Sequence, residues 1–325
     1  MSSEAIRCRI DPHVHCRDGV QSYKETIAHV LKVADEQGVY AVFDMPNTDP
    51  PIIRKVDVEA RLKYVPKSGE GRYFLYIGAT ADEGQLREAV KCYDEFPEVV
   101  GIKMFAGSST GDLAIISEKE QMGVYSALAE TGYRGVLAVH GEKEDRLRPK
   151  AWDTRKPVTH CRARPVDAEI ASVDDQIRFA KEAGFEGNLH ICHTTCPKVV
   201  RMVEEARKEM RITCGVTPHH MLWIENMMDR PEGALYKMNP PLRSREIVEG
   251  LRIRVLGGKV DWIETDHAPH ALGEKLHTPC PPSGYPSLYL YKEFLRILKE
   301  KGMKDDLIDA MTYHNIKKAF GHKVA

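Results

Sequence analysis

The chain has 325 residues, of which 42% are hydrophobic and 29% are charged, a composition typical of a globular protein. It excludes collagen-like, disordered and membrane-spanning classes. The 47 Lys and Arg residues balance 48 Asp and Glu residues, and the resulting net charge of −1 argues against a protein that coats nucleic acid or an anionic membrane.

Short apolar runs alternate with amphipathic stretches along the whole chain. Each run has the length of a buried strand, and several are apolar throughout, as parallel strands covered on both faces should be. The predicted strands are residues 7–14, 39–45, 73–79, 99–105, 135–140, 188–193, 210–216 and 259–265.

The first amphipathic stretch is the clearest helix. Ser22 and Glu25 have the spacing of a capping box, and Gly38 stands where a C-terminal cap belongs. Between them, apolar residues at positions 27, 30, 31 and 34 share one helical face. The other predicted helices are residues 84–95, 118–131, 165–183, 197–209, 245–256 and 287–301.

Eight alternating units predict an α/β fold of the (β/α)8 or TIM-barrel type. The first strand begins within the first dozen residues, and only residues 303–325 remain after the last predicted helix. We therefore expect one metal-dependent hydrolase domain over residues 1–325, with a short helical tail at about 303–325 and without a substantial β-sandwich domain. The active site of such a barrel lies at the carboxyl ends of its strands.

The residues that suggest chemistry stand at those strand ends. His13 and His15 are two apart in an extended chain and project to the same side, where two imidazoles can hold one metal ion. Later strand ends add donors, so that six nitrogen or oxygen ligands from five strands meet at the carboxyl end of the barrel. The set is His13, His15, Lys103, His140, His193 and Asp266.

Lys103 lies between apolar residues of a central strand, where a buried cation is costly. A salt bridge is one explanation. The other is that the amine is held neutral, reacts with carbon dioxide and becomes a carbamate that bridges two divalent ions. Imidazoles, carboxylates and a carbamate suit zinc, with manganese or cobalt as alternatives. Two such ions can deprotonate a water molecule and polarise the carbonyl group that it attacks.

These segments resemble the dihydroorotase family of amidohydrolases along nearly the whole chain. The resemblance is carried by DPHVHCR at residues 11–17, DMPNT at 44–48, GIKMF at 101–105, TPHH at 217–220, NPPLR at 239–243 and TDHAPH at 265–270. Two departures flank the ligands without replacing them. Gly141 follows His140 where many relatives have Cys, and MFAGSS follows Lys103.

The resemblance implies a binuclear centre, with carboxylated Lys103 shared between the ions. His13, His15 and Asp266 would bind one ion, and His140 and His193 the other. It also implies the reversible cyclisation of N-carbamoyl-L-aspartate to L-dihydroorotate in pyrimidine biosynthesis. A metal-bridged hydroxide would attack the cyclic amide, while Asp266 acts as general base and then as general acid.

Arg17 lies two residues beyond His15 and can present its planar fork to the substrate carboxylate. A salt bridge to Asp18 is the alternative. We interpret His219 and His220 as supporting loop residues. The resemblance implies further substrate contacts: Asn47 and His270 beside Arg17, Asn239 at the pyrimidine ring, and backbone hydrogen bonds from Gly284.

Residues 146–164 concentrate seven Lys and Arg residues around Asp153. A solvated loop is the first interpretation, and a lid over an anionic substrate or a partner surface is the second. The resemblance also leaves open a homodimer and an association with aspartate transcarbamoylase.

The eight cysteines include no Cys-x-x-Cys pair, and a chain of this length does not need disulfides. We expect reduced, structural cysteines and no thiolate zinc site at Cys192 and Cys196. The first ten residues lack the apolar core of a signal peptide, and no run approaches the roughly 18 apolar residues of a membrane span. A cytoplasmic protein is the expectation.

Three alternative functions share parts of this pattern. A hydantoinase or allantoinase would use the same barrel and metals but would not need Arg17 and Asn47 together. An inactive dihydroorotase-like scaffold would typically lose metal ligands, and all six are present here. A mononuclear deaminase would have no use for Lys103.

Overall fold

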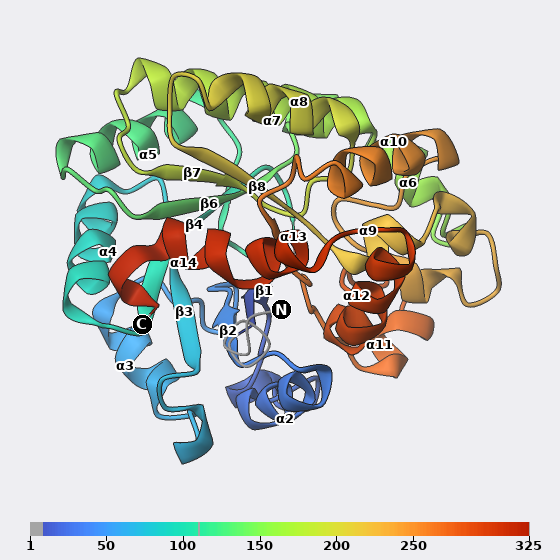
Figure 1. The fold of residues 1–325 in the computed structure, drawn as a ribbon, viewed down its shortest axis with the longest axis horizontal. Coiled ribbons are helices and arrows are strands. Elements are labelled where there is room, and N and C mark those ends of the chain that lie inside the picture. The colour runs from blue at the N-terminus through green and yellow to red at the C-terminus, as the bar shows by residue number, and fades with distance from the viewer. Residues whose placement is uncertain (1–8, 110, 325) are drawn as a thin grey trace.

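The computed structural model describes residues 9–109 and 111–324. Eight parallel strands form a nearly closed barrel in chain order, with helices on its outside, as predicted (Figure 1). The strands are β1 (Ile10–Val14), β2 (Ala41–Asp44), β3 (Tyr73–Gly78), β4 (Val99–Ala106), β6 (Val136–Gly141), β7 (Asn188–Ile191), β8 (Ile212–Val216) and β9 (Trp262–Ile263).

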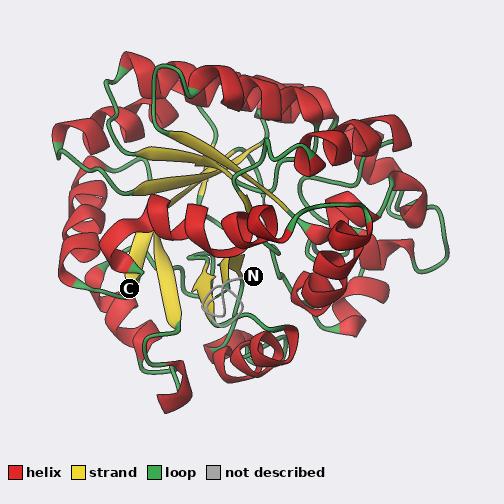
Figure 2. Ribbon diagram, in the orientation of Figure 1, coloured by secondary structure: helices red, strands yellow, loops and turns green. Residues whose placement is uncertain are grey.

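Helices surround the barrel and cover the outer faces of its strands (Figure 2). Within the part of the chain that the structure describes, no helix has both the length and the apolar composition of a membrane span. The long helices are α2 (Ile27–Gln37), α3 (Lys55–Leu62), α4 (Glu83–Glu95), α5 (Glu118–Glu130), α7 (Val166–Glu182), α8 (Pro197–Ala206), α10 (Arg245–Leu256) and α12 (Tyr291–Glu300). The short ones are α6 (Thr159–Ala163), α9 (Pro218–Leu222), α11 (Leu272–Leu276), α13 (Asp305–Asp309) and α14 (Asn315–Phe320).

All eight predicted strands are present, with shifted ends. Residues 7 and 8 of the first predicted strand lie outside the described residues. The additional β5 (Ala114–Ile115), which pairs with β4, is too short to carry a periodic signal. β7 and β9 end earlier than predicted, and each is followed within three residues by a left-handed residue, His193 (φ 38°) or Asp266 (φ 47°).

The predicted start of the first helix needs a correction. The N-cap is Thr26, whose side chain accepts a hydrogen bond from the His29 backbone N–H, and Gly38 ends the helix with φ 73° as predicted. Ser22 instead follows a 3-10 turn at Gly19–Gln21. The capping box is wrong because Asp18 accepts the Ile27 N–H at 2.9 Å and folds the preceding residues into that turn.

Helix α3 has no counterpart among the predicted helices. Its buried residues are Val58 and Arg61, so the face toward the barrel lacks an apolar stripe. Arg61 is buried because its guanidinium donates to the Asp44 carboxylate at the end of β2, at 2.6 and 3.0 Å. A helix that buries a charge for a specific partner is invisible to a pattern of hydrophobic residues.

The tail of the chain closes the amino end of the barrel, where β1 to β4 begin. α13 and α14, red in Figure 1, cross this end. The Phe320 ring lies 4.9 Å from the Phe43 ring centroid and 5.9 Å from that of Trp262, inside the barrel. Apolar side chains of the tail therefore fill the amino end of the barrel, and the carboxyl end of the strands stays open for an active site.

The barrel closes between β1 and β9 with little backbone pairing. β9 has two residues, and the seam has one isolated bridge, between Val14 and His267. The Asp11 carboxylate supplies hydrogen bonds across this seam in place of backbone pairing. It accepts one from the Thr265 backbone N–H at 2.9 Å and one from the Thr265 hydroxyl. Asp11 is fully buried, so both hydrogen bonds form away from water.

Replacing Asp11 by Ala should destabilise the barrel at this seam. The two Thr265 donors would lose their acceptor, and we expect the free energy of unfolding to fall by about 2 kcal/mol. Equilibrium urea unfolding measures the difference. The Asp11→Asn control keeps an oxygen acceptor and should lose less than Asp11→Ala, whereas equal losses in the two variants would contradict the role of these hydrogen bonds.

Candidate metal centre and active site

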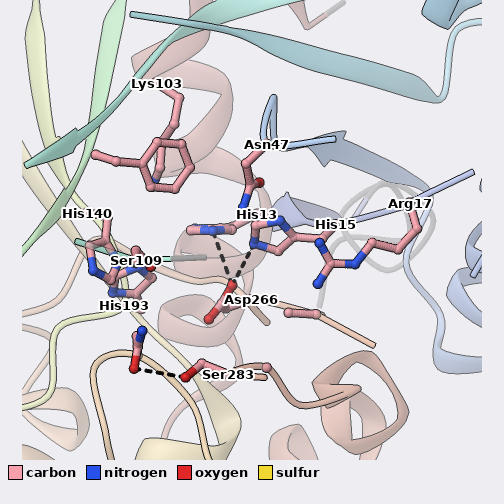
Figure 3. Close-up of a pocket in the computed structure, with 14 residues that line it drawn as sticks. His13, His15, Arg17, Asn47, Lys103, Ser109, His140, His193, Asp266 and Ser283 are labelled. Atoms are coloured by element: carbon pink, nitrogen blue, oxygen red, sulfur yellow. Dashed lines mark hydrogen bonds and ion pairs between the residues drawn. The ribbon is translucent and has the colours of Figure 1, made fainter. Parts of the chain in front are cut away.

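His13, His15 and Asp266 form one compact group of donors at the carboxyl end of the barrel (Figure 3). Asp266 Oδ1 lies 3.3 Å from His13 Nε2 and 3.0 Å from His15 Nε2. Two ligands of one tetrahedral zinc ion stand about 3.3 Å apart when each bond is about 2.0 Å long. The spacing of these three side chains therefore fits a single ion.

His140 and His193 form a second group beside the first. His140 Nδ1 lies 3.1 Å from His193 Nε2, which is again the spacing of two ligands on one ion. The His13 and His193 ring centroids are 5.3 Å apart, so the two groups share one site. Burial lowers the pKa of His13, His15 and His193 well below the usual value, which keeps these imidazoles neutral and able to bind a metal.

Lys103 completes the set from β4. Its side chain is fully buried, with Nζ 3.1 Å from Cys192 Sγ and 5.1 Å from the Phe105 ring centroid. In the described part of the chain no carboxylate forms an ion pair with Lys103. The structure therefore gives no support to a salt bridge, and a buried ammonium would lack a directly paired carboxylate.

Three of the predicted site residues adopt left-handed backbone conformations. Arg17 has φ 54°, His193 φ 38° and Asp266 φ 47°, and the one other described non-glycine residue with positive φ is Asp18. Side chains other than glycine adopt this region at a cost of roughly 1 kcal/mol or more. Each of these three residues follows the end of a strand, and its left-handed turn directs the side chain into the pocket.

Asp266 has the electrostatics of a group that exchanges protons near neutral pH. Burial raises the pKa of its carboxyl to about 7, and the positive charge of Lys103 opposes the rise. A carboxyl whose pKa lies near the working pH can both take and give a proton.

Glu142 holds His140 from behind. Its Oε2 lies 3.2 Å from His140 Nε2 and accepts hydrogen bonds from Arg164 Nε and Nη2 at 3.0 and 2.7 Å. Burial would raise the pKa of Glu142, but Arg164 and His140 together hold it well below its usual range. The carboxylate thereby turns Nδ1 of His140 toward His193.

Glu264 holds His193 in place through its backbone N–H, as Glu142 holds His140 through its ring. It accepts the His193 backbone N–H, His190 Nε2 at 2.9 Å and Trp262 Nε1 at 3.0 Å. Burial opposes a charge on His190, yet Glu264 raises the pKa of that imidazole to about 9. Sequence reasoning missed both residues, although a glutamate two positions from a proposed ligand, directly after a buried strand, is a usable signal.

Arg17, the first of the predicted substrate residues, lies on the side of Asp266 away from His140 (Figure 3). Arg17 Nε donates to the Pro269 carbonyl at 3.2 Å, and its Nη2 lies 3.3 Å from His270 Nε2. Asn47, Arg17 and Asn239 line the pocket together with His15. His270 contacts Arg17 without lining the pocket itself.

The Asp18 alternative for Arg17 finds no support. Asp18 accepts the Gly19 and Ile27 backbone N–H groups at 2.9 Å each. Arg17 forms no ion pair within residues 9–109 and 111–324, so its charge is available to an anionic ligand. Below it, Arg61 donates to the Arg17 carbonyl oxygen while paired with Asp44, which fixes this turn.

Both backbone polar groups of Gly284 already have partners within the protein, and the carbonyl oxygen keeps one lone pair for a further donor. Its N–H donates to the Lys237 carbonyl at 2.9 Å, and its own carbonyl accepts Lys275 Nζ at 2.9 Å. What the position requires is the absence of a side chain. With φ +147°, a Cβ would lie 2.4 Å from the Ala268 carbonyl oxygen.

The basic segment 146–164 is partly a solvated loop. Its basic side chains are exposed up to Arg162, but Arg164 turns inward to Glu142 and to the Ser108 carbonyl at 2.6 Å.

His219 and His220 support other loops, through Ser287 and the Pro240 carbonyl. Sequence reasoning also missed Ser109, Phe105 and Ser283, which line the pocket.

No family model matches the chain. Dihydroorotase from Aeropyrum pernix is 31% identical over 309 residues, covering 93% of this chain and 67% of that protein. Dihydroorotase from Halobacterium salinarum is 31% identical over 266 residues, covering 82% of this chain and 60% of the relative. The chain thus spans about two thirds or less of the length of these relatives.

Solved structures show the same fold. L-hydantoinase from Arthrobacter aurescens superposes with a TM-score of 0.84 at 21% identity, over 96% of this chain and 70% of that one. Dihydroorotase from Campylobacter jejuni superposes with a TM-score of 0.70 at 18% identity, over 96% and 82%. The barrel and the donors at its carboxyl end have the form of an amidohydrolase-type site. Within that class, the chain belongs to the dihydroorotase family.

Removing the Glu142 carboxylate should weaken metal binding at His140 and His193. We expect Glu142→Ala to lower the affinity for zinc about 10–100-fold, since a partner that orients a metal ligand typically contributes that much. Competition with a chromogenic chelator measures it. Glu118→Gln, a surface change on α5, should leave the affinity as it was, and an unchanged affinity in Glu142→Ala would rule out the orienting role.

Proposed function

We propose that the protein is a dihydroorotase that interconverts N-carbamoyl-L-aspartate and L-dihydroorotate in pyrimidine biosynthesis. One observation carries the proposal. A buried guanidinium without an ion-pair partner among the described residues, Arg17, lines the same pocket as Asp266 and the four histidines. Such a pocket suits a cyclic amide that carries a carboxylate.

The binding step rests on Arg17 and its neighbours. The fork of Arg17 is held by the Pro269 carbonyl and can form two parallel hydrogen bonds to a planar carboxylate. Asn47 from the loop after β2 and His270 beside the guanidinium are the proposed partners in this contact. Together they orient the ring with its amide bond toward Asp266.

The donor set fits two divalent ions, most simply zinc. His13, His15 and Asp266 would hold one, His140 and His193 the other, and a carbamate on Lys103 would lie between them. When bound, two such ions lower the pKa of a water molecule and polarise the amide carbonyl.

The surroundings of Lys103 support the proposed carbamate. An uncharged amine attacks the carbon of carbon dioxide, forms an N–C bond and releases a proton, and the product carries a negative charge. Two cations nearby would stabilise that anion, whereas an ammonium in the same place would have no carboxylate within ion-pair distance among the described residues. Cys192 and the Phe105 ring leave it no such partner.

Asp266 is the proposed proton carrier. In ring opening it takes a proton from the attacking water and delivers it to the ring nitrogen that leaves. In ring closure the same carboxyl works in the opposite direction. Its left-handed turn and its contacts with His13 and His15 keep the carboxylate at the centre of the pocket.

The alternatives are weaker on specific residues. Hydantoinases share this fold, but a hydantoin ring needs no carboxylate-binding fork such as Arg17 with Asn47. An inactive scaffold is disfavoured because all six donors converge.

A single domain is supported by one sheet that contains every strand of the described residues. A cytoplasmic location fits the seven described cysteines, none of which forms a disulfide. A homodimer and an association with aspartate transcarbamoylase stay predictions.

The purified, zinc-loaded protein should interconvert carbamoyl-aspartate and dihydroorotate. An ultraviolet assay follows the ring amide in both directions, and elemental analysis should find about two metal ions per chain. Arg17→Lys keeps the charge but loses the fork, and we expect its KM for dihydroorotate to rise about tenfold. Turnover of hydantoin without turnover of dihydroorotate would sink the substrate assignment.

Lys103→Ala should abolish activity, and short-chain carboxylic acids such as acetate or propionate should restore part of it by standing in for the carbamate. The exposed Lys119→Ala serves as the matched control and should behave like the unchanged protein. Full activity of Lys103→Ala without any added acid would refute the bridging role.

A further inference from the structure

Lys237 is a buried amine that the proposed mechanism does not use. Its side chain is 7% exposed, and Nζ donates a hydrogen bond to Ser283 Oγ at 2.8 Å. The Trp152 ring centroid lies 5.6 Å away, and within the described part of the chain Lys237 makes no ion pair. Ser283 lines the pocket of the active site, so this lysine stands directly behind the wall of that pocket.

The charge of Lys237 sets the direction of the next hydrogen bond. Burial lowers the pKa of the amine to about 8, and at neutral pH it remains mainly an ammonium. An ammonium has three N–H groups and no lone pair, so it can only donate. Ser283 Oγ must accept from the ammonium, and it donates its own proton to Asn239 Oδ1 at 3.0 Å, the bond drawn beside Ser283 in Figure 3.

His160 reaches the same oxygen from α6. Its Nε2 lies 2.9 Å from Asn239 Oδ1 and 3.1 Å from the Met238 carbonyl oxygen. A carbonyl oxygen can only accept, so Nε2 carries the proton and donates. Burial lowers the pKa of His160 to about 3, and the ring therefore holds one proton, on Nε2.

The two donors together decide which way the amide of Asn239 faces. The oxygen and nitrogen of an amide occupy similar volumes, and only the hydrogen-bond partners tell them apart. Since Ser283 and His160 both donate, the oxygen lies on their side and the NH2 group lies on the other. In the part of the chain that the structure describes, Nδ2 has no acceptor, and Asn239 lines the pocket.

We infer that Lys237, Ser283 and His160 are positioning residues that fix the amide of Asn239 as a hydrogen-bond donor to the substrate. The inference rests on the proposed function and deepens it. A donor at this wall recognises a carbonyl oxygen of the ring or of the open ureido group. A ligand with an amino group in its place would set donor against donor and bind poorly.

A double-mutant cycle tests the chain of hydrogen bonds. In Lys237→Met, Ser283 is free to turn its proton elsewhere, and we expect the KM for dihydroorotate to rise about tenfold while kcat stays nearly unchanged. In an Asn239→Ala background the same Lys237→Met change should have no further effect on KM. Lys237→Arg, which also can only donate, should restore KM.

Additive effects of Lys237→Met and Asn239→Ala would overturn the inference, because they would mean that Lys237 acts independently of the amide. Loss of kcat and KM together, without rescue by Lys237→Arg, would also overturn it in favour of a purely structural lysine.

A second measurement does not depend on turnover. Nitrogen-15 NMR of the His160 ring, assigned by comparison with His160→Gln, reports which nitrogen is protonated. Protonation at Nε2 supports the assigned direction of the amide, and protonation at Nδ1 would overturn it. If the unchanged protein fails to turn over dihydroorotate, the proposed function is wrong, while the NMR result still decides the inference.

Discussion

The site depends on how the barrel is closed between its first and last strands. Asp11 accepts two hydrogen bonds from Thr265, and these join β1 to the segment after β9 where backbone pairing is nearly absent. Asp11 lies two residues before His13, and Thr265 directly precedes Asp266. The same contacts that seal the barrel therefore bring the Asp266 carboxylate within 3.0 Å of His15.

Buried acid–base pairs support the pocket from outside the donor set. Asp44 pairs with Arg61, Glu142 with Arg164 and Glu264 with His190. Buried pairs of this kind contribute little net stability, because desolvation offsets their attraction. Their effect is geometric: each contacts a turn or ring that carries a site residue, and each restricts it to one orientation.

Much of the fold and the donor set could be predicted from the sequence because both follow from periodic patterns. Buried parallel strands are apolar throughout, and chemistry gathers where they end. The features that could not be predicted depend instead on contacts between residues far apart in the chain, which leave no periodic pattern. Helix α3 buries Arg61 for a partner elsewhere in the chain, and Glu264 works through a histidine 74 positions away. The role of Gly284 depends on the position of the Ala268 carbonyl, which only the folded chain reveals.

The left-handed turns at His193 and Asp266 bear on how the protein can be improved. Glycine adopts this backbone region without steric penalty, so replacing either residue by glycine would relieve local strain while deleting a proposed metal donor. Selection of variants for heat resistance alone would thus favour the loss of side chains to which we assign chemistry. Durability and catalysis make opposite demands on these two positions, and a stabilised enzyme has to gain its stability elsewhere.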